Sequence, residues 1–352
     1  MLKHFIVTRL GLGVHHQPWY DSTLGLFEAI TFPSLRAQTD QEFAWLLVVD
    51  QQIPAAALKR LKNIVGDTRN PHIVPIDLTN LRRVRHGCFD HVWDCCSDYI
   101  TTHRLLSEPS EYIVTSTIDA DDAWRRNTIE LVRRQFDGQI ARLLAAESAR
   151  TAVIRHTCGQ VLTFPRGLRW FVEANVVQPM DYEFLSMSVF VLGRFSSGIS
   201  ALSSRHSAWP AMAHALLFET EKARPDRAMW VYVRHDRTQI DWRLESAESD
   251  DASKQLLQSE FGIDFAQVNA WRDNNALRRS EARPDLHPGL SSGEQHDCYF
   301  QIAALNRQIA ILEQKQQQEG LNNEDECLVV MQRAARLKLL ERFRQQGQRV
   351  FQ

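Results

Sequence analysis

The sequence contains no apolar run that approaches the roughly 18 residues needed to cross a bilayer. The short apolar stretch over residues 1–13 is interrupted by Arg9 and is more typical of a β-strand than of a secretory signal. The six cysteines show neither the paired CxxC spacing of a zinc site nor a compact disulfide framework. We therefore expect reduced thiols, a cytoplasmic protein and no membrane-spanning helix.

An excess of charge of one sign is also absent. Lys and Arg total 41 and Asp and Glu total 43, so the formal net charge is −2. A balance this close to neutral gives no electrostatic reason to expect a nucleic-acid partner. The hydrophobic fraction of 44% and the charged fraction of 24% are those of an ordinary globular protein.

Strand-like and helix-like stretches alternate over residues 1–125. Apolar, β-branched runs predict buried strands over residues 5–8, 43–49, 72–76 and 112–118. Helical spacing of apolar residues predicts helices over residues 24–38, 55–65 and 89–106, the first kinked or broken at Pro33. This alternation predicts a parallel sheet covered by helices on both faces, with ligands at the carboxyl ends of its strands.

The pattern changes after residue 125. We predict a helix over residues 129–146, a hairpin of strands 152–156 and 160–164, and further strands over residues 187–192 and 229–233. A parallel half followed by antiparallel strands favours one mixed-sheet α/β domain over residues 1–245. Residues 246–352 are predicted to form a helical C-terminal extension, with polar linkers over residues 246–253 and 278–293.

Two helices are predicted in this extension. The helix over residues 295–318 is rich in Gln, and the helix over residues 326–346 is basic and amphipathic. A basic amphipathic helix can lie on the anionic inner face of a membrane, pack on its own domain, or contact another chain, including a second copy. The sequence leaves these alternatives open.

The predicted strand over residues 112–118 runs directly into Asp119-Ala120-Asp121-Asp122. Two carboxylates at positions i and i+2, just past a strand end, can bind a hard divalent cation that neutralises a diphosphate. An Asp-rich turn can also do no more than cap the next helix. Because polar Thr8, Arg9 and Asp50 follow earlier strands, the turn more closely matches the rim of a nucleotide pocket.

These segments resemble the GT-A-fold glycosyltransferases, most closely a bacterial family labelled as rhamnosyltransferases. The resemblance rests on residues 5–9 (FIVTR), 32–39 (FPSLRAQT), 43–50 (FAWLLVVD), 117–123 (TIDADDA) and 230–235 (WVYVRH). It covers about residues 1–240 and implies a GT-A-like fold with a Rossmann-like nucleotide-binding half. It also implies a nucleotide-sugar donor, a saccharide or lipid-linked saccharide acceptor, and Mn²⁺ or Mg²⁺ as cofactor.

The resemblance implies a role for each residue of the motifs. Asp121 is expected to bind the metal directly, with Asp119 contacting the metal or the ribose and His235 completing the metal site. Asp122 is expected to orient neighbouring groups or the donor sugar. Thr8, Arg9 and Asp50 are expected to contact the nucleotide, although each could equally be a strand-end residue with a local role.

An inverting transferase needs a carboxylate that takes the proton of the acceptor hydroxyl. Glu183 is the preferred candidate because it follows the turn at Pro179 and precedes a predicted strand. The other candidates in the same half are Asp181, Glu219 and Glu221. The aromatic residues Trp170, Phe171 and Trp209 could form a sugar-stacking platform or belong to the core.

The sequence also allows two alternatives to a transferase. A metal-dependent phosphatase or nuclease could use the acidic cluster, but the first strand lacks a nucleophilic Asp-x-Asp and the chain lacks a basic excess. A non-catalytic scaffold with a degenerate transferase domain could use the C-terminal helices to recruit other proteins. The intact acidic motif favours the enzyme over that scaffold.

Overall fold

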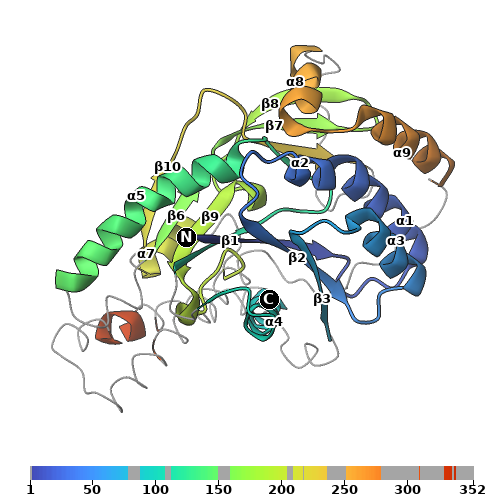
Figure 1. The fold of residues 1–352 in the computed structure, drawn as a ribbon. Coiled ribbons are helices and arrows are strands. Elements are labelled where there is room, and N and C mark those ends of the chain that lie inside the picture. Colours follow the sequence, from blue (N-terminus) through green and yellow to red (C-terminus); the bar gives the residue numbers. More distant parts are fainter. Residues whose placement is uncertain are drawn as a thin grey trace, which may run out of the picture.

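The computed structural model describes residues 2–77, 88–107, 112–149, 159–203, 209–216, 218–235 and 251–278, together with residues 309, 329–334 and 337. Its largest element is a seven-stranded sheet in the order β10-β6-β9-β4-β1-β2-β3 (Figure 1). Its strands are β1 (Lys3–Leu10), β2 (Phe43–Asp50), β3 (Pro71–Ile76), β4 (Tyr112–Thr117), β6 (Gln160–Thr163), β9 (Val189–Arg194) and β10 (Glu219–Lys222).

The strands β1, β2, β3 and β4 are parallel to one another, whereas β9 runs antiparallel to both β4 and β6. β1 and β4 are fully central and their side chains are almost all buried, which explains their continuous apolar sequences. The parallel half followed by antiparallel β9 confirms the predicted mixed α/β class.

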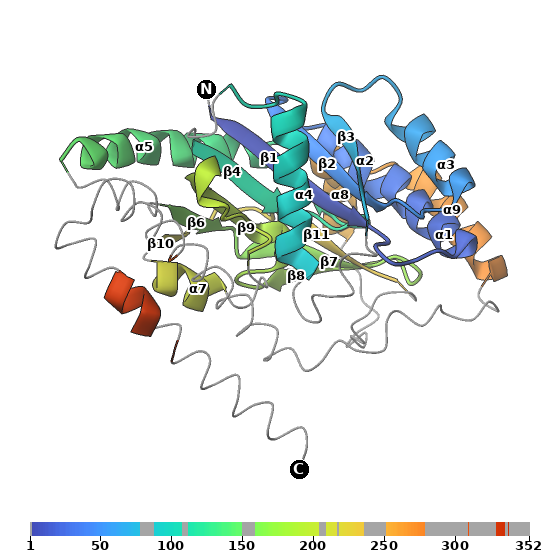
Figure 2. The same cartoon turned by 90° about the horizontal axis from the view of Figure 1, so that it is seen from below.

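Helices cover both faces of the large sheet. The helices are α1 (Gln17–Leu26), α2 (Phe32–Arg36), α3 (Ala55–Val65), α4 (Cys88–Thr102), α5 (Thr128–Ala149), α7 (Trp209–Leu216), α8 (Asp251–Phe261) and α9 (Phe265–Arg278). Side chains of α1, α3 and α5 share one core with alternate residues of β1 and β2, and α4 packs with the opposite set. Figure 2 shows α4 crossing the face opposite α1 and α3.

The helix predicted over residues 24–38 is continuous through Pro33. A π-helical turn (Phe27–Thr31) joins α1 to α2, and Pro33 lies in the first turn of α2. The helical run is not interrupted at Pro33, so a break there was wrong, whereas the predicted kink stays untested.

A second sheet has the order β5-β11-β7-β8, with strands β5 (Ala123–Trp124), β7 (Arg166–Phe171), β8 (Val176–Asp181) and β11 (Trp230–Arg234). α8 and α9 lie over this sheet (Figure 1). Their apolar side chains form one core with residues of α1, β7 and β11, including Leu26, Trp170 and Val233. This core continues across the boundary predicted at residue 245, and the division into domains there stays a prediction.

Several other predictions have a structural outcome. β6 pairs with β9 and β10, so both of its edges are occupied and it cannot form the predicted hairpin, whose first arm lies outside the described residues. Trp170 and Trp209 are fully buried, which makes them core residues and excludes them from a sugar-stacking platform. The predicted C-terminal helices lie mostly outside the described residues, although residues 329–334 are helical.

Crossing a bilayer demands a long, apolar helix, and the helices that the structure describes include none of this kind. The predicted membrane contact of the basic C-terminal helix is a separate matter, because a surface helix does not need to span. That contact stays a prediction.

Candidate active site

The acidic turn follows β4 at the centre of the large sheet. Asp119 lies just past the strand, where its carboxylate faces the guanidinium of Arg9 at 3.7 Å and accepts a hydrogen bond from the Ser186 hydroxyl at 3.4 Å. Loss of water around Asp119 raises the pKa of its carboxyl, and Arg9 partly offsets this effect. The structure therefore brings together Arg9, within the C-terminal end of β1, and Asp119, just past the neighbouring parallel strand β4.

Asp121 and His235 form the closest pair at the turn. The Oδ2 atom of Asp121 lies 2.9 Å from Nε2 of His235, although the two residues are 114 positions apart in the sequence. The His235 side chain is 8% exposed and that of Asp121 is 22% exposed, so the pair is sheltered but reachable. Trp271 of α9 packs edge-on against the imidazole ring.

These atoms can be tested against the needs of a divalent cation. Two donor atoms bound side by side to a cation at roughly 2.0–2.2 Å lie about 3 Å apart. The Asp121–His235 spacing of 2.9 Å meets this requirement. Among the described residues, no three His, Cys, Asp or Glu side chains converge to hold a metal ion. The same spacing is that of an ordinary hydrogen bond, and a cation held by these two side chains would need further ligands from elsewhere.

Asp122 is buried, whereas the side chains of Asp119 and Asp121 are partly exposed. It is 1% exposed, and its Oδ1 accepts a hydrogen bond from the backbone N–H of Val233 at 2.9 Å, while Oδ2 is buried without a hydrogen-bond partner. Burial, together with the negative charges of Asp121 and Asp119, raises the pKa of Asp122 well above its usual range. Its observed contact holds β11, the strand that ends just before His235.

Thr8 and Asp50 are both buried. The Thr8 hydroxyl donates to the Ile118 carbonyl at 2.8 Å and accepts from the Trp45 indole at 2.9 Å, so it ties together β1, β2 and the end of β4. The Asp50 carboxylate accepts hydrogen bonds from the N–H groups of Gly13 and Gln52 and lies 3.0 Å from His15. Their predicted nucleotide contacts are untested by this arrangement.

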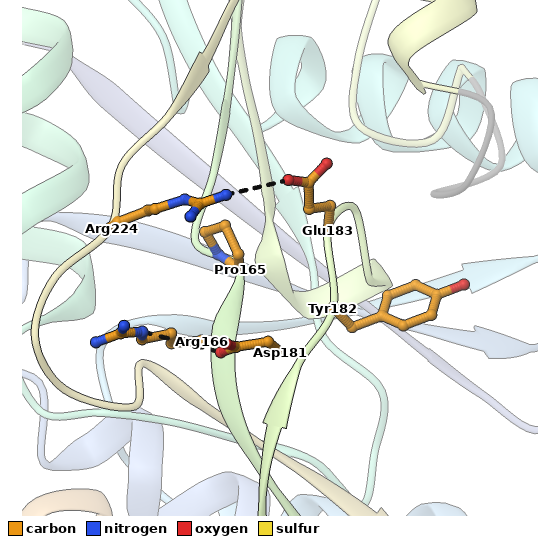
Figure 3. A pocket seen from close by; sticks show the side chains of 6 residues that line it. All are labelled: Pro165, Arg166, Asp181, Tyr182, Glu183 and Arg224. Carbon is orange, nitrogen blue, oxygen red and sulfur yellow. Dashed lines mark ion pairs between the residues drawn. The ribbon is translucent and has the colours of Figure 1, made fainter.

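Glu183 lies on a separate, open pocket of about 270 Å³, lined by Pro165, Arg166, Asp181, Tyr182, Glu183 and Arg224. Figure 3 shows two ion pairs there, Arg224 with Glu183 at 3.6 Å and Arg166 with Asp181 at 3.9 Å. Lys222 also donates to Glu183 at 2.7 Å. The hydrogen bond from Lys222 lowers the pKa of Glu183, which makes the carboxylate a weaker base in this arrangement.

The sequence reading missed residues at the site. Ser186, in a short 3-10 turn, reaches Asp119 from the start of β9, and the Thr117 hydroxyl holds its carbonyl at 3.1 Å. Arg234 is a buried cation at the end of β11. A serine before a strand carries no recognisable signal, but an arginine inside a motif segment, next to His235, could have been singled out.

The chain matches one protein-family model over most of its length. A family model described as "Putative rhamnosyl transferase" matches residues 14–238, which include the acidic turn and His235. The chain belongs to this glycosyltransferase family. No curated protein matches it.

Solved structures with similar folds are distant from this chain. One is Staphylococcus aureus TarS 1-349 in complex with UDP, with 13% identity, a TM-score of 0.38, and coverage of 100% of this chain and 92% of that one. Another is mouse xyloside xylosyltransferase 1 in its apo form, with 11% identity, a TM-score of 0.26, and coverage of 62% of this chain and 78% of that one.

Proposed function

We propose that this chain transfers a sugar from a nucleoside diphosphate to a hydroxyl of a saccharide or lipid-linked saccharide, with Mn²⁺ or Mg²⁺ as cofactor. The observation that carries the proposal is the pair formed by Asp121 and His235, 2.9 Å apart. It joins two sheets at the carboxyl end of β4, where open α/β sheets bind their ligands.

In this proposal the chain's own residues divide the work. Asp121 and His235 would hold the cation, and Asp119 would contact the ribose or the cation from the rim that it shares with Arg9. When bound, the cation neutralises the diphosphate and so stabilises the leaving group. Thr8 and Asp50 would support the nucleotide side of the rim, where their contacts order β1, β2 and the loop before α1.

Glu183 is proposed as the base of an inverting reaction. Its pairing with Lys222 and Arg224 keeps its carboxylate charged, but that pairing also competes with a proton from the acceptor. An acceptor that displaces Lys222 would relieve this competition. Glu183→Gln is expected to lower kcat much more than it changes donor binding, with Asp181→Asn on the same pocket as the control.

A thermal-shift screen of UDP, GDP, dTDP and CMP, each with Mn²⁺ or EDTA, tests the donor and the metal together. A ligand that binds only the folded chain raises the free energy of unfolding by about 2.7 kcal/mol at a hundredfold excess over Kd. We expect one nucleotide to shift the wild-type chain in Mn²⁺ alone, and Asp121→Asn to remove the shift. A chain that no nucleotide stabilises would instead favour a scaffold with a degenerate transferase domain.

A further inference from the structure

The end of β11 holds a buried cation, the guanidinium of Arg234. Arg234 is 4% exposed, and among the described residues no ion pair joins its guanidinium to an acidic side chain. Burying a guanidinium is costly unless an anion or strong acceptors satisfy it. Within the described part of the chain, Arg234 therefore interacts with the charge of Asp122 at a distance, but no ion pair satisfies its guanidinium.

The contacts that Arg234 does make are with an uncharged group. Nη1 donates to the Tyr232 hydroxyl at 3.1 Å, and the guanidinium carbon lies 5.2 Å from the centre of the Tyr232 ring. Burial raises the pKa of Tyr232 to about 12, so this phenol stays neutral at physiological pH and supplies no counter-charge. The Nε atom of Arg234 is buried without any hydrogen-bond partner.

Arg234 lies beside the acidic turn. It follows Val233, whose N–H binds Asp122, and precedes His235, which contacts Asp121. Tyr232 and Arg234 are two positions apart in β11, so their side chains lie on one face of that strand, whereas Val231 and Val233 pack under α8 and α9. The cation is therefore placed on the inner side of the strand that delivers His235.

We propose that Arg234 is an anion-binding residue that contacts the diphosphate of the donor. An arginine presents a planar set of N–H donors that suits phosphate oxygens, and a buried one is already ordered before the ligand arrives. The inference rests on the proposed function, because it takes the nucleoside diphosphate as the ligand. The competing interpretation is that Arg234 only balances the buried charge of Asp122 through a bridging water.

Arg194 provides a matched control. It ends β9 as Arg234 ends β11, and its guanidinium carbon lies 4.7 Å over the ring of Tyr112. Arg194 pairs with Tyr112 at the start of β4, whereas Asp119 follows the end of that strand. It therefore has the same kind of arginine–tyrosine contact, but at the end of β4 that lies away from the acidic turn.

The test is isothermal titration of UDP with Mn²⁺ into wild-type chain and the variants Arg234→Gln, Arg234→Lys and Arg194→Gln. Binding of uridine, which lacks phosphate, is followed by ligand-observed NMR. We expect Arg234→Gln to weaken UDP binding at least tenfold and Arg234→Lys to weaken it less. Neither variant should change the binding of uridine. Arg194→Gln should bind both like the wild type. If the thermal-shift screen selects another base, its nucleoside and diphosphate replace uridine and UDP.

Two results would overturn the proposal. Equal UDP affinity in wild type and Arg234→Gln would show that Arg234 does not contact the diphosphate. A parallel loss of UDP binding and uridine binding would indicate a structural role for Arg234 instead. Failure of the proposed function is recognised separately, because no nucleotide would then bind the wild-type chain. Inorganic pyrophosphate is the probe in that case: binding that Arg234→Gln loses and Arg194→Gln keeps supports an anion site, and any other pattern refutes it.

Discussion

Helices α8 and α9 are expected to be required for folding of the residues that precede them. Five of their apolar side chains, or side chains of the turn between them, are at most 6% exposed: Leu257, Phe261, Ile263, Val268 and Trp271. Full burial of such a side chain contributes about 1.5–3 kcal/mol, so the five together contribute about 7–15 kcal/mol as an upper estimate. This contribution is comparable to the whole free energy of unfolding of a typical domain, about 5–15 kcal/mol.

The perturbation is truncation of the chain to residues 1–245, compared with residues 1–278. The shorter chain also exposes the apolar residues of α1, β7 and β11 that α8 and α9 cover. It loses the ion pair between Arg125 and Glu260 at 2.6 Å as well. We expect residues 1–278 to unfold cooperatively in urea and residues 1–245 to show no cooperative transition by circular dichroism.

A single substitution tests the same reasoning in the full chain. The Trp271 indole donates to the Ser22 carbonyl at 2.9 Å and packs closely over Gly25, where an added Cβ would lie 2.7 Å from the ring. Trp271→Ala is expected to cost about 3–5 kcal/mol. Leu256→Ala, at a 37% exposed position of α8, should change stability by less than about 0.5 kcal/mol. A cooperative, undiminished transition in residues 1–245 would refute the shared core.

Three further predictions concern single residues. Asp122→Ala should weaken Mn²⁺-dependent nucleotide binding because it releases the Val233 amide, whereas Asp122→Asn keeps an acceptor and should retain binding; titration calorimetry separates the two. Burial lowers the pKa of His4 to about 3, so only the unfolded chain takes up that proton below pH 6.5. Stability should fall by up to about 1.4 kcal/mol per unit as pH drops from 6.5 towards 3, and His4→Gln should flatten that slope in urea titrations at several pH values. Gly167→Ala should destabilise the chain by about 1–3 kcal/mol because its Cβ would lie 2.1 Å from Trp230. Gly138→Ala, in open space on α5, should stabilise it by about 0.5–1 kcal/mol, and equal melting temperatures for the two variants would contradict this account.

The central strands were predictable because each is buried on both faces. The run predicted over residues 43–49 is observed as β2 (Phe43–Asp50), and the helix predicted over residues 55–65 matches α3. Of the second sheet, only β11 (Trp230–Arg234) was predicted, as a strand over residues 229–233. β7 carries arginines at Arg166 and Arg169, and β8 contains Pro179, so neither shows the alternation or the apolar run that indicates a strand. β7 is a strand because it pairs with β11 and β8, and β8 because it pairs with β7.

The rim of the site was predictable from strand ends, but the use of each side chain was not. Thr8 looks like a polar residue past a strand, yet β1 continues to Leu10, so Thr8 is enclosed and its hydroxyl serves the sheet. Arg234 looks like an exposed strand end, yet it is only 4% exposed. In both cases burial depends on distant segments that local sequence does not reveal.

The acidic turn contacts segments that are far apart in the sequence. Asp119 contacts β1 through Arg9, Asp121 contacts His235 after β11, and Asp122 binds the backbone of β11. Trp271 of α9 then packs on His235 from the outside. Because each contact crosses a different boundary, the geometry of the proposed metal pair depends on both sheets and on α9. A Trp271 variant that is still folded should therefore bind Mn²⁺ more weakly than the wild-type chain. Unchanged Mn²⁺ affinity in such a variant would indicate a site held by the acidic turn alone.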